Sequence, residues 1–178
     1  YFRKKEFVGK RDSVYDAGEL TCGYINLYCK GKGKVKITYA ECMAFVENGN
    51  VVKRNRNDEN GVVIGSYDVL EIDGEYMFEP YWLRTFRYIE ITIEGNVEIC
   101  SFDYIETGYP IEVSDKYDFE SDTDNKLFDI SVNTLKRCMH ETYMDCPYYE
   151  QLQYAMDTYL QVMYTYQITT DKALPEKA

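Results

Sequence analysis

The sequence predicts an α+β multidomain fragment, in which an antiparallel β-sandwich is followed by the first helices of a larger helical domain. From Tyr1 to about Glu112, apolar residues recur with a period of two, and clusters of Gly, Asn and Asp interrupt them. After Pro110 the spacing changes to three and four, which is typical of one face of a helix. We therefore predict a sandwich domain at residues 1–113 and the N-terminal part of a helical domain at residues 114–178.

Strand alternation is clearest on either side of Gly31-Lys32-Gly33. The apolar positions of the two flanking runs are Ile25, Leu27 and Cys29 before it, and Val35, Ile37 and Tyr39 after it. Because alternate side chains of a strand point to opposite faces, each run is expected to bury one face. The glycine-rich segment between the runs is expected to be a hairpin connection.

Further turn signals divide the rest of the β-rich part. Asp73-Gly74 and Gly95-Asn96 are expected to be turns, the second one lying between strands at Phe86–Ile93 and Val97–Ile105. The polar, Asn-rich segment from Glu47 to Asn60 is expected to be a long loop. The only tryptophan, Trp82, is expected to anchor the sandwich core in preference to stacking on a sugar.

Two helices and the start of a third are expected in the C-terminal part. Ser121 or Thr123 can cap the first helix. The second helix is expected to begin near Pro147, because proline suits the first helical turn, and Leu174-Pro175 is expected to open a third. The expected apolar faces are Leu127, Ile130, Thr134, Leu135 and Cys138 on the first helix, and Ala155, Tyr159, Val162, Met163 and Tyr166 on the second. These faces need partners that the chain does not contain, unless they fold back on the sandwich.

Composition excludes several classes of protein. The net charge of −11 repels phosphate backbones, so no nucleic acid partner is expected. No run of about 18 apolar residues is present, so no membrane partner is expected. The six cysteines form no tight C-x-x-C pair, so neither a zinc ribbon nor a thioredoxin-like site is indicated. Their even number permits disulfides, but a chain of this length does not need them, which favours reduced thiols and a cytoplasmic protein; an upstream signal peptide would make it periplasmic or secreted. Neither a cofactor nor a metal ion is expected, because Cys138, His140 and Cys146 match no common zinc spacing.

Candidate chemistry is concentrated between Asp145 and Asp157. The segment contains carboxylates at Asp145, Glu150 and Asp157 and an amide at Gln153. On a helix, Glu150 and Asp157 would share one face, because seven residues make about two turns. Hydrolysis of a glycosidic bond needs one carboxylic acid to protonate the leaving oxygen and a second carboxylate to activate water or attack the sugar. A solvated acidic face has the same spacing, so the spacing alone does not establish catalysis.

The order of these residues resembles a known signature. Residues 145–157 read DCPYYEQLQYAMD, which resembles the D-C-P-x-R-E-Q-x-x-Y-x-G-D segment of bacterial α-L-rhamnosidases. Phe78-Glu79-Pro80 and Phe86-Arg87-Tyr88-Ile89 also resemble the last sandwich strands of that family. Two positions depart from the signature, since Tyr149 stands where the family usually has Arg and Met156 where it usually has Gly.

The resemblance implies both a fold and a set of roles. It implies a β-sandwich directly before an (α/α)6 barrel, with the active site in the barrel. It also implies that Glu150 is the catalytic general acid and that Asp145 and Asp157 bind the rhamnose ring. Gln153 and Tyr154 join them as candidate substrate-binding residues. Members of the family invert the anomeric centre with a general base far downstream, which lies outside this chain.

The implied partners are a rhamnose-containing glycan or glycoside and the remainder of the chain's own catalytic barrel. Two other hypotheses stay open. The aromatic-rich sandwich and the departures at Tyr149 and Met156 permit a non-catalytic carbohydrate-binding module. The sandwich can also have a purely structural role, in which it packs on the barrel and orients it.

Overall fold

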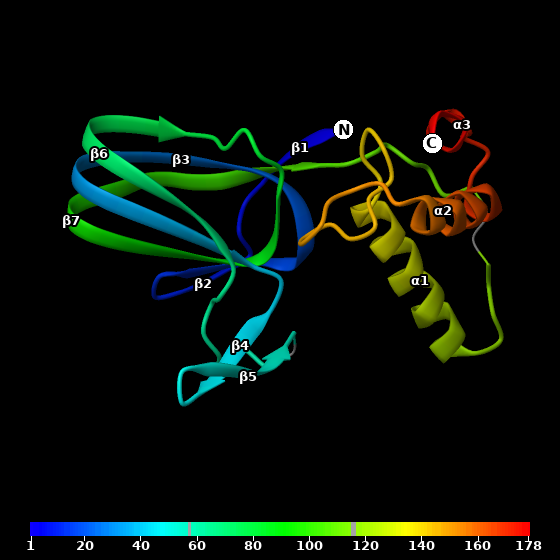
Figure 1. Ribbon diagram of the computed structural model, residues 1–178, viewed down its shortest axis with the longest axis horizontal. Helices are drawn as coiled ribbons and strands as arrows, with labels where there is room; N and C mark the ends of the chain where they lie inside the picture. Colours follow the sequence, from blue (N-terminus) through cyan, green and yellow to red (C-terminus); the bar gives the residue numbers. More distant parts are fainter. Residues whose placement is uncertain (57, 115–116) are drawn as a thin grey trace. The chain divides into compact units, whose positions relative to one another are not determined.

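The chain forms two compact units in the computed structural model, which describes residues 1–56, 58–114 and 117–178. One unit spans Phe2–Glu106, and the other consists of Thr107–Ala178 together with Tyr1. The first is built of antiparallel strands and the second of helices and loops (Figure 1). The predicted succession of an antiparallel β-rich part and a helical part is therefore confirmed.

Strands of the first unit form a main sheet and a separate hairpin. They are β1 (Phe2–Lys5), β2 (Gly9–Arg11), β3 (Val14–Ala40), β4 (Met43–Glu47), β5 (Asn50–Asn55), β6 (Ser66–Phe78) and β7 (Arg84–Thr107). The main sheet has the order β1-β7-β3-β2, and β6 also pairs with β3. β4 and β5 form a separate two-stranded sheet, and Ala44 of β4 also forms an antiparallel bridge with Val62.

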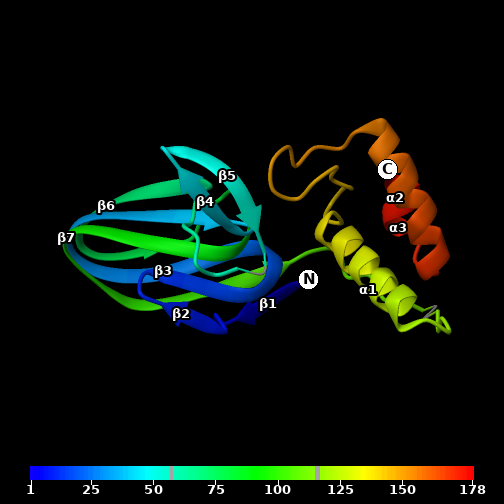
Figure 2. The same cartoon turned by 90° about the horizontal axis from the view of Figure 1, so that it is seen from below.

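Three long strands, β3, β6 and β7, bend together near their middle (Figures 1 and 2). At the bend, Gly31 of β3 is paired with Gly74 of β6, and Gly33 is paired with Gly95 of β7. Each of these glycines lies inside a continuous strand. The expected hairpin at Gly31-Lys32-Gly33 and the expected turns at Asp73-Gly74 and Gly95-Asn96 are therefore wrong.

Gly31 shows why the bend needs glycine. Its φ is +131°, and a Cβ atom built on it would lie 2.1 Å from the backbone oxygen of Asn96 on β7. Only a residue without a side chain allows the two backbones to approach so closely. Glycine occurs both in tight turns and at close approaches of two backbones, so the same sequence pattern is compatible with a hairpin and with this bend.

The core of the first unit is filled from both sides of the bend. Ile25 and Leu27 before it, and Val35 and Ile37 after it, are buried in one cluster. The predicted burial of alternate residues along these two runs is confirmed. Because the two halves of β3 contribute to the same core, the bend folds the sheet over on itself and creates two facing layers (Figure 2).

Two further expectations for this unit need correction. Trp82 is 64% exposed, so it does not anchor the core. It follows Pro80 on the connection between β6 and β7 and therefore has no inward-facing strand position. The segment Glu47–Asn60 is not one long loop, because β5 lies within it and pairs with β4. The β-branched residues Val51 and Val52 favour this strand, while Asn57 lies outside the described residues.

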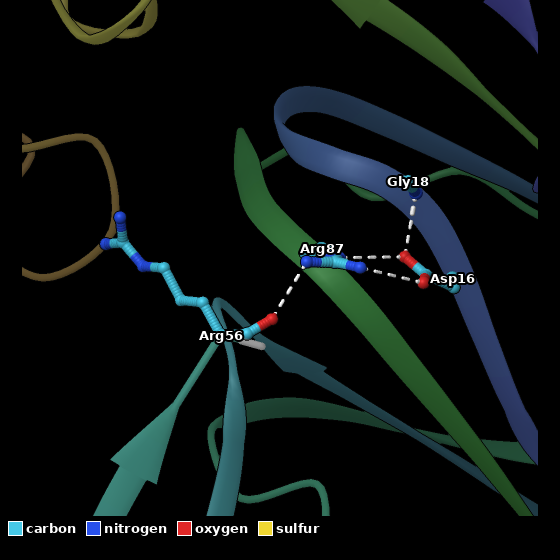
Figure 3. Close-up of polar contacts among 4 residues, drawn as sticks. All are labelled: Asp16, Gly18, Arg56 and Arg87. Carbon is cyan, nitrogen blue, oxygen red and sulfur yellow. Dashed lines mark hydrogen bonds and ion pairs between the residues drawn. The ribbon is translucent and has the colours of Figure 1, made fainter. Parts of the chain in front are cut away.

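A bidentate ion pair between Arg87 and Asp16 joins β7 to β3 (Figure 3). Arg87 donates from Nε to Oδ1 of Asp16 at 3.1 Å and from Nη2 to Oδ2 at 3.3 Å. Its Nη1 donates to the carbonyl oxygen of Arg56 at 2.9 Å, and Asp16 also accepts from the N–H of Gly18 at 2.7 Å. A planar guanidinium can satisfy these directions at once, so Arg87 fixes the segment after β5 against the sheet.

The helices of the second unit are α1 (Asp122–Arg137), α2 (Ala155–Ile168) and α3 (Ala173–Lys177). Of the two caps expected for α1, Ser121 is the one present, since its hydroxyl accepts from the N–H of Asp124. The expected third helix is present as α3, which contains Leu174-Pro175. None of these helices, within the described ranges, has the length and apolarity that a membrane crossing requires.

The buried face of α1 differs in part from the expected one. Leu135 and Cys138 are buried as predicted, but Leu127 and Ile130 are 61% and 63% exposed. Phe128 packs against the core of this unit, on the same face as Leu135, which lies about two helical turns further along. The sequence offers two apolar stripes on this helix, and only tertiary packing selects one.

The expected apolar face of α2 is wrong except at Val162, which packs against the core of this unit. The buried residues of α2 are Thr158, Thr165 and Ile168, whereas Tyr159 and Met163 of the expected face are exposed. The exposed large apolar side chains of α2 are Met156, Tyr159, Leu160, Met163, Tyr164 and Tyr166. The more apolar side of the helix therefore faces away from the core of its own unit.

Candidate active-site loop

Residues 145–154, which precede α2, do not form a helix. The start expected near Pro147 is wrong, because α2 begins at Ala155. Gln151 has a φ of +54°, which a right-handed helix cannot contain, and Tyr154 is extended. Glu150 and Asp157 therefore do not share a helical face.

Instead, residues 145–152 form a closed loop. The N–H of Asp145 donates to the carbonyl oxygen of Leu152 at 2.8 Å. The N–H of Leu152 donates back to Oδ1 of Asp145 at 3.1 Å. Inside the loop, the side-chain amide of Gln151 donates to the carbonyl oxygen of Pro147 at 2.8 Å. These bonds fix both ends of the loop and the turn at its tip.

The loop brings three polar side chains together. One polar atom each from Asp145, Cys146 and Glu150 lies within 4.8 Å of the others. The thiol of Cys146 donates to Oε2 of Glu150 at 2.6 Å, and its sulfur accepts from the N–H of Glu150 at 3.4 Å. Glu150 is exposed and Asp145 is half-buried. The cluster therefore offers one solvent-accessible carboxyl group held beside a second, more fixed one.

The other three candidates lie on the next residues along the chain. Gln153, Tyr154 and Asp157 are all exposed. Tyr154 is the N-cap residue of α2, and its carbonyl oxygen accepts from the N–H of Thr158 at 2.8 Å. Asp157 lies in the first turn of α2, where a carboxylate interacts favourably with the helix dipole. The structure thus places a carboxylate oxygen of Asp145 within 4.8 Å of one of Glu150, and it leaves the remaining candidates exposed at nearby positions in the chain.

The distance between the carboxyl groups of Asp145 and Glu150 limits the chemistry that these two residues can perform together. An inverting glycosidase needs its two carboxyl groups roughly 6.5–9.5 Å apart, so that a water molecule fits between acid and base. Asp145 and Glu150 lie closer than that. Oδ1 of Asp145 is moreover engaged by the N–H of Leu152. Asp145 is therefore suited to holding a ligand hydroxyl beside Glu150 and not to activating water for it.

Two residues near this loop were not assigned a site role from the sequence. The sequence groups Cys146 only with Cys138 and His140 as a zinc spacing, but in the structure Cys146 contacts Glu150 and His140 contacts the carbonyl oxygen of Arg137. Gln161 of α2 donates to the carbonyl oxygen of Met144 at 2.6 Å, directly before the loop. The spacing of three and four among the polar residues Thr158, Gln161 and Thr165 is the signal that marks this face of α2.

His140 gives a pH-dependent prediction for this unit. Burial lowers the pKa of its imidazole from the ordinary value of 6.5 and outweighs the hydrogen bond with the backbone of Arg137, which raises the pKa; the charge of Arg137 lowers it further. Between the lowered pKa and 6.5 the unfolded chain binds more protons than the folded one, so stability is lost as the pH falls through this range.

We expect the urea midpoint to decrease from about pH 8 to about pH 5, and His140→Gln to flatten this part of the profile. The check is urea unfolding, followed by far-UV circular dichroism, across that pH range. An unchanged slope in the variant would show that another group is responsible.

Structural comparison identifies the architecture. The chain superimposes on a family GH78 rhamnosidase of Bacillus sp. GL1 with a TM-score of 0.71 and 20% sequence identity, over 96% of this chain. A rhamnosidase from Klebsiella oxytoca, solved with rhamnose bound, matches with a TM-score of 0.66 and 12% identity over 89% of the chain. An α-L-rhamnosidase from Dictyoglomus thermophilum matches with a TM-score of 0.52 and 19% identity over 83%.

The matched region is a small part of each of these proteins. The chain spans 18%, 33% and 17% of their respective lengths. No protein-family model and no curated protein matches the sequence. The comparison therefore establishes that the chain has the fold of one segment of these rhamnosidases.

Proposed function

We propose that the chain is part of a glycoside hydrolase that removes terminal α-L-rhamnose from glycosides or polysaccharides with inversion. The closed loop supports this best, because it holds the carboxyl groups of Asp145 and Glu150 within 4.8 Å of each other in a segment with the rhamnosidase signature. The fold shared with a segment of three rhamnosidases supports the same conclusion independently of the signature.

Glu150 is the general acid in this proposal. Its carboxyl group is exposed, so a glycosidic oxygen can approach it. Asp145 accepts a sugar hydroxyl through the oxygen that Leu152 does not occupy. Gln153, Tyr154 and Asp157 bind the ring from the adjacent exposed positions. The general base is supplied from outside residues 1–178, since Asp145 lies too close to serve as one.

The partner of the helical unit is the remainder of an (α/α)6 barrel, of which residues 114–178 are the first part. The exposed apolar side chains of α2, together with Leu127 and Ile130 of α1, support this. Apolar surface of this extent normally lies in an interface. The helices of a barrel bury such faces against their neighbours.

The two departures from the signature bear on the substrate. Tyr149 is 65% exposed and packs edge-on against Tyr148, and Met156 is 69% exposed. Neither side chain takes part in the bonds that close the loop. An aromatic ring replaces a guanidinium at Tyr149, which favours stacking on a sugar face over hydrogen bonding to a hydroxyl.

Release of p-nitrophenol from p-nitrophenyl α-L-rhamnoside tests the proposal. We expect hydrolysis by the complete protein and none by residues 1–178 alone, because the base and most of the barrel are missing from the latter. The same assay with p-nitrophenyl β-D-glucoside serves as a control for the sugar. A folded complete protein that releases no nitrophenol from the rhamnoside would contradict the assignment.

A further inference from the structure

The two residues before the candidate loop are both hydrogen-bonded to α2. Tyr143 is fully buried, and its hydroxyl donates to Oγ1 of Thr165 at 2.8 Å. The carbonyl oxygen of Met144 accepts from Nε2 of Gln161 at 2.6 Å. Thr165 in turn donates to the carbonyl oxygen of Gln161 at 2.7 Å, which links the two attachments.

These bonds hold the backbone at the point where Asp145 begins the loop. The N–H of Met144 donates to the carbonyl oxygen of Cys138 at 2.8 Å, so both backbone groups of Met144 are engaged. The next residue, Asp145, makes the backbone and side-chain bonds to Leu152 that close the loop. The Gln161 amide therefore binds the residue directly before Asp145, whose carboxylate is proposed to bind the sugar.

The buried polar residues of α2 lower the stability of the fold compared with apolar residues at the same positions. Oγ1 of Thr158 and Oε1 of Gln161 are buried and have no hydrogen-bond partner among the described residues. Apolar side chains at these two positions would fill a core without that penalty. A glutamine is needed only if its amide must reach a defined acceptor, which here is Met144.

We propose that Gln161 is a positioning residue, which orients the Asp145 carboxylate toward the sugar by fixing the carbonyl group of Met144. The identity of the sugar in this inference rests on the proposed function. The statement that Gln161 fixes the loop at Met144 does not depend on it. Replacement of Gln161 should let the loop shift at Asp145, and it should leave Glu150 able to protonate a leaving group once the sugar is bound.

The test uses the complete protein and three variants of α2. For p-nitrophenyl α-L-rhamnoside, we expect Gln161→Leu to raise KM about tenfold while kcat falls less than about threefold. The KM of Gln161→Glu should fall toward the wild-type value as the pH falls, since only the protonated carboxylic acid can donate to the carbonyl oxygen of Met144. Gln167→Leu, an exposed glutamine on the same helix, is the matched control and should behave as wild type.

Hydrogen exchange of residues 144–152, measured by mass spectrometry, separates the two proposals. Faster exchange in Gln161→Leu than in Gln167→Leu, together with the raised KM, supports the positioning role. Unchanged exchange overturns it whatever the enzyme hydrolyses, and so does faster exchange with an unchanged KM. A wild-type protein without rhamnosidase activity defeats the proposed function alone, and the exchange result then still decides whether Gln161 fixes the loop.

Discussion

Glu150→Gln in the complete protein is expected to lower kcat by about 10²–10⁴ on a rhamnose-containing disaccharide, whose leaving group is a hydroxyl of the second sugar. The amide is close in shape to the carboxyl group but cannot donate the proton that a poor leaving group needs. Nitrophenolate leaves readily without protonation, so the loss on p-nitrophenyl α-L-rhamnoside should be much smaller. Steady-state kinetics on both substrates, with KM determined separately, measure the difference.

The matched control is Glu112→Gln, which removes another exposed carboxylate from the same unit. It should leave both substrates unaffected. Equal losses on the two substrates in Glu150→Gln would indicate a binding role, and near-normal turnover of the disaccharide would remove Glu150 from the mechanism. Unchanged circular dichroism of the variant is required, because Glu150 also accepts the bond from Cys146.

Gly31→Ala is expected to destabilise the β-rich unit by about 4 kcal/mol or more. The new methyl group would lie 2.1 Å from the carbonyl oxygen of Asn96, on a backbone with a φ of +131°. Neither strand can move away easily, because β3 is paired on both sides at this point. Urea unfolding of the chain, followed by circular dichroism, gives the change in unfolding free energy.

Gly74→Ala is the control for Gly31→Ala, because Gly74 is paired with Gly31 at the same bend. Its φ of +100° strains any side chain, but a Cβ atom there would meet nothing within 4 Å. We expect this variant to cost roughly 1–3 kcal/mol, from backbone strain alone. Equal costs at the two positions would show that the close approach to Asn96 does not matter for stability.

Local patterns predicted the features that depend on neighbouring residues. The alternation around Ile25 and Ile37 identified the buried faces of β3, since side-chain direction in a strand follows from position alone. The pair of cap candidates Ser121 and Thr123 located the start of α1 to within two residues, because a cap bonds to an N–H only three residues away. The change of period after Pro110 separated the strands from the helices for the same reason.

Only the tertiary structure decided the features that depend on distant segments. Gly31 marks a bend and not a hairpin because the backbone of β7 lies against it, and nothing within the neighbouring sequence indicates that. The faces of α1 and α2 were misassigned because each helix carries more apolar surface than its own unit covers. Glu150 meets Asp145 through a closed loop and not along a helix, because the bonds between Asp145 and Leu152, and the positive φ of Gln151, override the helical spacing. The sequence by itself therefore predicts which residues carry the candidate chemistry, whereas long-range hydrogen bonds and packing determine how these residues are arranged.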